Sequence, residues 1–256
     1  MEKFRNKWNK LHGRSERDVA VLFNKLLSKQ IRAIAATASK DGVNAALGKV
    51  DRLIQRDDFK TLYEEIYLKV GYSYYLLQKS ELEQMKRLPT VGLGFFSDIW
   101  RIYIQEALLK KIIAERITQV SELTKEKVRT ALSFAGSQGL AKQDVAKYLR
   151  EQMPMFSANR SKVIARTETT HAASIGQKFA ADTSTLELEK VWVSLSFDDG
   201  RIRADHLAAN DQRVPKNGKF NVGGVQMEYP GDPAGGASNC ANCRCGIAYV
   251  VKGFES

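Results

Sequence analysis

The chain has 256 residues, 43% of them hydrophobic, and is therefore long enough to bury a core without disulfide staples. Its 40 Lys and Arg against 29 Asp and Glu give a net charge of +11, which favours acidic or polyanionic partners. The sequence has no run of 18 apolar residues, and no apolar stretch follows the charged N-terminus. These features argue against a membrane span and a secretion signal, so we expect the protein in the cytoplasm when it is made.

The first part of the chain carries most of the positive charge. Residues 1–118 hold 22 Lys and Arg against 14 Asp and Glu, a balance of +8, which leaves +3 for residues 119–256. Apolar residues recur in the first part every three or four positions, which is the spacing of amphipathic helices. We expect helices that begin at Ser15 and near Asp57, with a break at Gly42.

A tyrosine-rich segment, residues 72–77, continues the helical pattern. Stacking of its rings on nucleic-acid bases is one interpretation, but packing against a neighbouring helix is favoured. Residues 89–94 contain Pro and Gly and predict a break, after which the apolar stripe runs from Phe96 to about Ile117. Residues 1–118 are therefore predicted to form a basic, all-helical region.

Residues 119–181 predict a run of shorter helices. One helix is expected to stop before Pro154, because proline lacks the N–H of the helix ladder, and Ser157 is placed to cap the next. Within that next helix, Glu168 and His171 share the apolar stripe. A buried carboxylate is costly without a partner, so we expect nearby groups to satisfy it.

Three interpretations are open for Glu168 and His171. The favoured one is a satisfied polar pair that fixes the helix against the C-terminal region, with Arg201 or Arg203 as the counter-charge. The second is general acid and base chemistry, since burial can shift the pKa of either group. The third is metal ligation by His171.

Period-two patterns in the last quarter of the chain predict strands. Residues 191–197 alternate as a half-buried strand does, and two short runs flank Gly223-Gly224, a spacing typical of a tight hairpin. Residues 246–251 predict a final strand. The expected fold class is α+β, with helices followed by a small antiparallel sheet.

All three cysteines lie close together near the C-terminus. Cys240, Cys243 and Cys245 together with His206 have the composition of a zinc site with three thiolates and one imidazole. More than thirty irregular residues separate His206 from the cysteines, and a metal would offset the cost of ordering that segment. Two alternatives stay open: one or two cysteines are ordinary small buried residues, or two of the three form a disulfide.

Several short motifs follow one another in residues 119–256. In chain order they are Ile164-Ala165-Arg166-Thr167-Glu168-Thr169, Trp192, Asp199, Arg201, Arg203, His206, Phe220, Tyr229-Pro230-Gly231-Asp232-Pro233 and Asn242-Cys243-Arg244-Cys245. This ordered set resembles the phage Mu F-like minor head proteins, the phage head morphogenesis family. The chain departs from the family pattern at Cys240, which is an addition to the usual ending, and at residues 207–210, where the family often has Gly.

The resemblance implies a non-catalytic minor capsid protein of the virion, located at the portal vertex or in the capsid interior. It would act in head assembly and in DNA packaging or ejection, with the portal protein, the major capsid or scaffold proteins and packaged DNA as partners. Residues 119–256 would form the head morphogenesis domain, whereas residues 1–118 carry no motif of the family.

The candidate site residues fall into two groups. The metal ligands for structural Zn²⁺ are His206, Cys240, Cys243 and Cys245, and the polar cluster comprises Arg166, Glu168, His171, Asp199, Arg201 and Arg203. Two other functions stay open. One is a nuclease or transferase that uses His206, Arg203 and Glu168, and the other is non-specific DNA binding by the basic helices.

Overall fold

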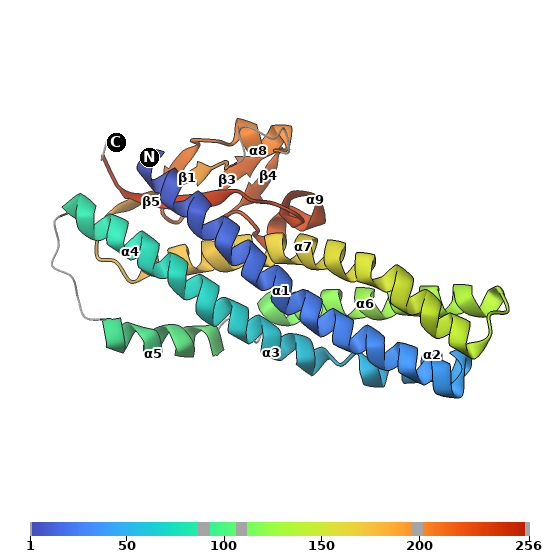
Figure 1. The fold of residues 1–256 in the computed structure, drawn as a ribbon. Helices are drawn as coiled ribbons and strands as arrows, with labels where there is room; N and C mark the ends of the chain where they lie inside the picture. Colours follow the sequence, from blue (N-terminus) through green and yellow to red (C-terminus); the bar gives the residue numbers. More distant parts are fainter. Residues whose placement is uncertain (1, 87–92, 106–111, 196–201, 254–256) are drawn as a thin grey trace. The chain divides into compact units, whose positions relative to one another are not determined.

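A computed structural model of the chain describes residues 2–86, 93–105, 112–195 and 202–253 (Figure 1). Its helical elements are α1 (Glu2–Asp41), α2 (Val43–Leu53), α3 (Arg56–Ile66), the π-helical η1 (Tyr67–Gly71), α4 (Tyr72–Lys86), α5 (Leu93–Tyr103), α6 (Ile112–Ser137), α7 (Lys142–Asp182), α8 (Ala204–Ala208), the 3-10 helix η3 (Pro233–Gly235) and α9 (Gly236–Cys240). The strands are β1 (Leu188–Val193), β2 (Arg213–Pro215), β3 (Phe220–Val222), β4 (Val225–Met227) and β5 (Gly246–Val251). The predicted α+β class is confirmed. No helix in the described part of the chain combines the length and apolarity needed to cross a membrane.

The strands form two antiparallel sheets. The larger has the order β2-β1-β5, with Trp192 of β1 opposite Ile247 of β5. The smaller is the β3–β4 hairpin, whose loop residues Gly223 and Gly224 have φ of 58° and 81°, as a tight two-residue turn requires. Both the hairpin and the final strand are confirmed.

The first strand differs from its prediction. It begins at Leu188 and ends at Val193, whereas the sequence predicted residues 191–197. Because β1 is the central strand of its sheet, five of its six positions are buried, and Glu189 is the partly exposed one. Ser194 and Leu195 are not part of the strand, and residues 196–201 lie outside the described part of the chain.

Helix α1 begins at Glu2, so the predicted start at Ser15 is wrong. Phe4, Trp8 and His12 are buried at intervals of four residues, and Ser15 is buried on the same side. The apolar stripe of α1 therefore continues toward the N-terminus as far as Phe4. The predicted break at Gly42 is confirmed, with a φ of 93° at this residue.

Helix α6 runs without a break through the position where the sequence predicted a helix end, near Ile117. Two buried polar residues interrupt the apolar pattern there. The hydroxyl of Ser121 donates to the carbonyl oxygen of Thr118 at 3.0 Å, and that of Thr124 donates to Val120 at 2.6 Å. Each hydroxyl is thus satisfied within the helix, so the helix continues although its apolar signal is weak.

Helix α7 is a single helix of 41 residues that continues through position 154, so the predicted stop before Pro154 is wrong. A proline within a helix removes one backbone N–H donor and costs about 3 kcal/mol. Burial on both sides of this position offsets that cost, with Val145 and Leu149 before it and Ile164 and Ala165 after it.

Contacts divide the chain into two compact units. The first comprises Met1–Asp18, Ile66–Ile104 and Val163–Ser256, and the second comprises Val19–Glu65 and Gln105–Lys162. Each unit combines segments from both sides of residue 118. The predicted domain boundary at residue 118 rests on charge and on family motifs, whereas the two compact units are defined by contacts. The two-domain division therefore stays a prediction.

The second unit is all helical. Its buried side chains come from α1, α2, α3, α6 and α7 and include Phe23, Leu27, Ile34, Val50, Phe59, Tyr63, Val128, Leu132, Val145 and Leu149. The rings of Phe23 and Tyr63 meet edge to face at 5.8 Å between centroids.

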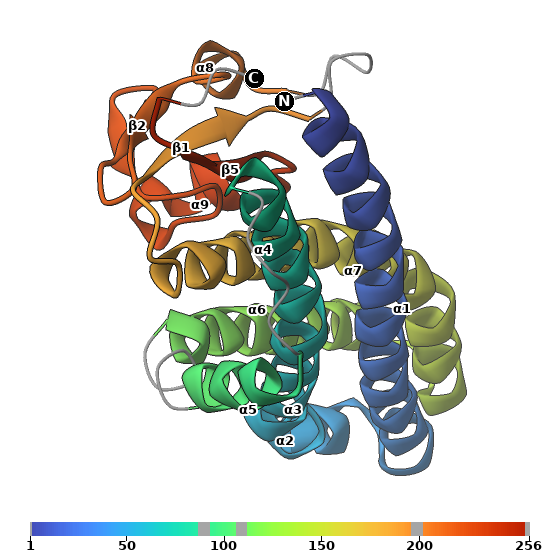
Figure 2. The ribbon, with the colours of Figure 1, turned by 90° about the vertical axis from the view of Figure 1, so that its left-hand side faces the viewer.

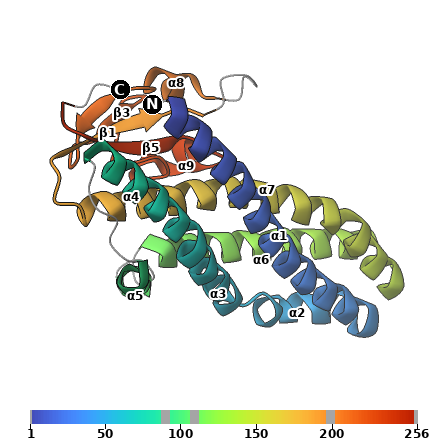
Figure 3. The same cartoon turned by 60° about the vertical axis from the view of Figure 1, so that its left-hand side comes forward.

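The first unit contains both sheets, which lie together with α9 on one side of the C-terminal half of α7 (Figures 1 and 3). Helix α4 lies beside β5 (Figure 2), and the buried side chain of Gln78 ties the two together. It donates to the carbonyl oxygen of Tyr249 at 2.8 Å and accepts from the Tyr249 N–H at 3.0 Å. Gln177 of α7 donates to the carbonyl oxygen of Ile247 in the same strand. β5 is thereby held by both helices.

Glycines allow two close approaches in the first unit. A Cβ on Gly176 of α7 would lie 1.9 Å from the carbonyl oxygen of Gly71 in η1, so only glycine permits this helix crossing. A Cβ on Gly246 of β5 would lie 2.7 Å from the indole of Trp8, which brings the start of α1 against the sheet.

Candidate metal centre

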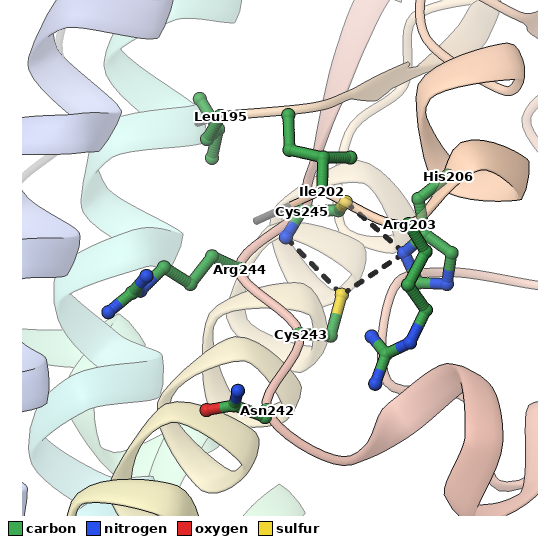
Figure 4. A pocket seen from close by; sticks show the side chains of 8 residues that line it. All are labelled: Leu195, Ile202, Arg203, His206, Asn242, Cys243, Arg244 and Cys245. Carbon is green, nitrogen blue, oxygen red and sulfur yellow. Dashed lines mark hydrogen bonds between the residues drawn. The ribbon is translucent and has the colours of Figure 1, made fainter. Parts of the chain in front are cut away.

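Two neighbouring cysteines and a histidine 37 positions before the first of them converge in the first unit. His206 lies on α8, and Cys243 and Cys245 lie in the turn that leads into β5 (Figure 4). The Nδ1 atom of His206 is 3.5 Å from Sγ of Cys243 and 3.4 Å from Sγ of Cys245. All three side chains are buried.

This geometry fits a bound zinc ion. The three potential ligand atoms lie within 4.8 Å of one another. Zinc takes thiolate sulfur at about 2.3 Å and imidazole nitrogen at about 2.0 Å, so tetrahedral ligands of one ion stand about 3.6 Å apart. The two nitrogen to sulfur distances in the protein are close to that value, which supports the donor set of two cysteines and one histidine.

The ring of His206 is oriented by Asn239 of α9. Its Nε2 lies 3.3 Å from Oδ1 of Asn239, a partner that accepts a hydrogen bond. With the proton on Nε2, the lone pair of Nδ1 faces the two sulfur atoms. A metal-binding histidine commonly has its second nitrogen held in this way.

The two thiols interact with each other and with the backbone. Their mutual hydrogen bond, together with burial, raises the pKa of Cys243 well above its usual value. The same bond lowers the pKa of Cys245, and the hydroxyl of Ser194, 3.8 Å from its sulfur, acts in the same direction. The N–H of Cys245 also donates to Sγ of Cys243 at 3.3 Å. Without a metal, the thiol of Cys243 therefore keeps its proton, and the sulfur of Cys245 accepts a hydrogen bond from it.

Cys240 does not join the other two cysteines. Its Sγ donates to the carbonyl oxygen of Asp232 at 2.9 Å, at the end of α9. The group of His, Cys, Asp and Glu residues that could hold a metal consists of His206, Cys243 and Cys245 within the described residues. The structure thus brings together three of the four predicted ligands. All three cysteines are free thiols in this structure.

The family-like motif on α7 supports the cysteine turn. Asn242 has a positive φ of 59°, and its N–H donates to Oγ1 of Thr167 at 2.9 Å. Arg166 donates to Oδ1 of Asn242 at 2.9 Å, and Thr170 donates to the carbonyl oxygen of Cys243 at 2.6 Å. The Arg-Thr-x-x-Thr spacing places these three donors and acceptors along one face of the helix. Arg166 of the predicted polar cluster therefore positions the turn.

The N-terminal part of α1 adds an acid to the same network. Glu16 accepts from Arg166 at 2.7 Å and from Nε of Arg244 at 3.1 Å. Burial acts to raise the pKa of Glu16, but the hydrogen bonds from Arg244 and Arg166 outweigh it and lower the pKa below its usual value. This ion pair connects α1, α7 and the residue between the two cysteine ligands.

A buried histidine lies beside this ion pair. Nε2 of His12 is 3.1 Å from Oγ1 of Thr170, which itself donates to the cysteine turn, so His12 is the donor. Burial lowers the pKa of His12 to about 4, although the nearby carboxylate of Glu16 acts to raise it. The neutral ring therefore belongs to the packed interior of the first unit.

Glu168 and His171 lie next to η1 of the same unit, where each contacts Tyr67. The Tyr67 hydroxyl donates to Oε2 of Glu168 at 3.0 Å and lies 2.5 Å from Nδ1 of His171, from which it accepts. The ring of His171 also lies 5.8 Å from that of Tyr229. Glu168 and His171 are 3% and 0% exposed and share Tyr67 as a partner, whereas the predicted counter-charge Arg201 lies outside the described residues, so the satisfied polar pair stays a prediction.

The remaining residues of the predicted polar cluster divide between two places. Arg203 lies at the cysteine turn, where its Nη2 donates to the carbonyl oxygen of Ala241 at 2.6 Å. Asp199 and Arg201 lie outside the described residues. Sequence reasoning missed Asn239, Glu16 and Tyr67. Asn239 lies next to Cys240 in the sequence, which could have indicated that it belongs to the site, whereas no local pattern indicates Glu16 or Tyr67.

Comparison with known proteins gives one match. Residues 126–248 match the family described as Phage Mu protein F like protein. Neither the curated proteins nor the solved structures contain a match. The matched segment begins in α6 and ends in β5, so it includes every residue of the candidate metal centre and of the cysteine turn. The resemblance read from the ordered motifs is confirmed over this segment, because residues 126–248 match the Phage Mu protein F like family.

Proposed function

We propose that the protein acts in phage head morphogenesis as a minor, non-catalytic component of the virion. The observation that carries this proposal is the family match over residues 126–248, which includes the three residues of the candidate metal centre. At the finer level, we propose that it sits at the portal vertex or in the capsid interior. Its partners there would be the portal protein and the major capsid or scaffold proteins.

A structural role for the site is supported by how its residues are used. Glu168 and His171 are buried against Tyr67, and Arg166 holds the cysteine turn. Acid and base catalysis on a macromolecule needs groups that the substrate can reach. We propose that the site is structural: bound Zn²⁺ would be held by His206, Cys243 and Cys245 and would connect α8 to the turn before β5. The ion supplies folding free energy in such a role.

Co-expression with the head proteins of the same phage tests the proposal. The protein should be present in purified procapsids, and omission of the portal protein should remove it if the portal is its attachment point. Retention without the portal would assign it to the capsid or scaffold instead. Absence from procapsids that contain every other head protein would contradict a role in the head.

The surface of α1 favours a second candidate function, contact with packaged DNA. Exposed cations recur on this helix at spacings that keep them on one face: Lys3, Lys10, Arg14, Arg17, Lys25, Lys29, Arg32 and Lys40. Asp18, 4.0 Å from Arg14, is an acid on the same face. Such a row suits the phosphate backbone without base specificity.

Salt dependence tests this second function. Each phosphate contact should contribute about −0.9 to the slope of log affinity against log salt concentration on duplex DNA. Replacing Lys25, Lys29 and Arg32 by Gln should reduce the magnitude of the slope by about 2 to 3. Replacing Lys125, Arg129 and Lys252, which pair with Asp51, Asp51 and Glu187, is the matched control with the same charge change. Equal slopes for the two variants would exclude α1 as the DNA contact.

A further inference from the structure

The metal centre has three described protein ligands, whereas zinc takes four. The sulfur that the sequence offered as the fourth ligand is engaged elsewhere, since Cys240 donates to the carbonyl oxygen of Asp232 at 2.9 Å. Sites in which the protein supplies three ligands commonly keep the fourth position for water or an exchangeable ligand. The residues around His206, Cys243 and Cys245 therefore determine which ligand can occupy the fourth position.

A small pocket of about 30 Å³ adjoins the trio. Its lining includes all three potential ligands, together with Arg203, Asn242 and Arg244 (Figure 4). This volume corresponds to about one water molecule. Arg203 and Arg244 are partly exposed and Asn242 is exposed, so the pocket is bounded by side chains that reach solvent. As far as the described residues define this pocket, one ligand atom can approach the metal position from solvent.

The charges around the pocket favour an anionic ligand. Zinc with two thiolates and a neutral imidazole has no net charge, so an added carboxylate leaves one negative charge to be balanced. Figure 4 shows Arg203 beside His206, whereas Arg244 points away from the sulfur atoms and binds Glu16. Nη2 of Arg203 donates to Ala241, and a guanidinium has five N–H donors, so it has capacity for a second acceptor.

We propose that the zinc site of His206, Cys243 and Cys245 keeps one exchangeable position facing this pocket, and that a carboxylate oxygen replaces the water there. Arg203 is the positioning residue that balances the charge of the carboxylate. The end of an Asp or Glu side chain or of a free carboxylic acid provides such an oxygen atom. This inference rests on the metal binding proposed above and adds a ligand class to it.

Cobalt substitution tests the inference on the full chain. Co²⁺ in place of zinc should give thiolate charge-transfer bands, which report metal binding, and d–d bands, which report the ligands and coordination number. Acetate should shift the d–d bands saturably, while the neutral analogue acetamide should not.

Two variants complete the test. Cys240→Ser should leave both sets of bands unchanged, because its sulfur is not a ligand. Arg203→Gln should weaken acetate binding about tenfold, and Arg203→Lys should restore part of it, because a charged hydrogen bond contributes about that factor. Arg203→Gln should keep the charge-transfer bands, which separates loss of acetate binding from loss of the site.

The failures of the two proposals are distinguishable. If charge-transfer bands do not form at all, the metal site itself is wrong. If they form but acetate has no effect, or if Cys240→Ser removes part of their intensity, the site is closed by protein ligands and the exchangeable position is wrong. Equal responses to acetate and acetamide would likewise overturn the choice of an anion.

Discussion

At the scale of single residues, Asn242 determines the direction of the cysteine turn. Its φ of 59° is in the left-handed region, which asparagine tolerates better than most residues. Its side chain also accepts from Arg166 at 2.9 Å. The same residue thus supplies both the backbone conformation and the bond that holds the turn on α7.

Replacing Asn242 by Ala should destabilise the protein by about 1–2 kcal/mol, because it removes the bond from Arg166 and leaves a strained backbone. Asn242→Gly removes the same bond but accepts the positive φ, so its cost should be smaller. Urea unfolding of both variants measures the difference. A larger loss for Gly than for Ala would show that the backbone conformation at this position is not the cause.

The buried His12 predicts a pH dependence of stability. Its pKa is lowered from 6.5 to about 4 in the folded protein, so the unfolded chain binds the proton more readily. The stabilisation from the neutral ring is therefore full above pH 6.5 and is lost as the pH falls from 6.5 toward 4. Between pH 7 and pH 5 the free energy of unfolding should drop by about 2 kcal/mol from this residue.

The variant His12→Gln isolates this effect, because its amide can still donate to Thr170 but does not titrate. The drop between pH 7 and pH 5 should be smaller in the variant by about the same 2 kcal/mol. Glu16, whose pKa is also lowered, contributes stability that is lost only at lower pH, below its usual value of 4.5. Identical pH profiles for wild type and variant would contradict the burial of a neutral His12.

The site was predictable from the sequence where its residues cluster locally. Cys243 and Cys245 are two residues apart, and their composition together with His206 indicates a metal site without any alignment. Cys240 was included for the same reason, but three-dimensional placement turns its sulfur toward Asp232. Glu16 was not predictable, since it reaches Arg244 across 228 positions of sequence.

At the scale of elements, the presence of the helices was predictable from the sequence, but the residues at which they begin and end were not. The stripe of α1 was recognised, but its extension to Phe4 and Trp8 was lost among the charged residues around them. In α6, Ser121 and Thr124 are buried within the stripe because each hydroxyl bonds to the backbone of its own helix. In α7 the proline rule failed, because tertiary packing outweighed one missing backbone bond.

The crossing of α7 and η1 gives a prediction at this scale. Gly176→Ala should destabilise the protein by about 1–3 kcal/mol or more, because the new methyl would meet the carbonyl oxygen of Gly71. Gly13→Ala is the matched control in the same unit, since its Cβ would meet only the end of Arg17 at 3.6 Å. The control should be stabilised by about 0.5–1 kcal/mol through helix propensity. Thermal unfolding that gave equal shifts would contradict the close crossing.

At the scale of the whole molecule, the α+β class and the family-like segment were both predictable from the sequence. The compact units were not, because α1, α3 and α7 each supply residues to both units. A single boundary in the sequence cannot separate two units that each combine segments from both halves of the chain. The proposed role in the phage head rests on the family match over residues 126–248, and Arg166 connects two motifs of that segment by its bond to Asn242.

Zinc content per chain tests the central claim most directly. Elemental analysis of the purified 256-residue chain should give about one zinc per chain for the wild type and for Cys240→Ser. The double variant Cys243→Ser/Cys245→Ser should contain none, with circular dichroism recorded to show that its helices remain. Absence of zinc from the wild type, or its retention in the double variant, would contradict the metal centre of His206, Cys243 and Cys245.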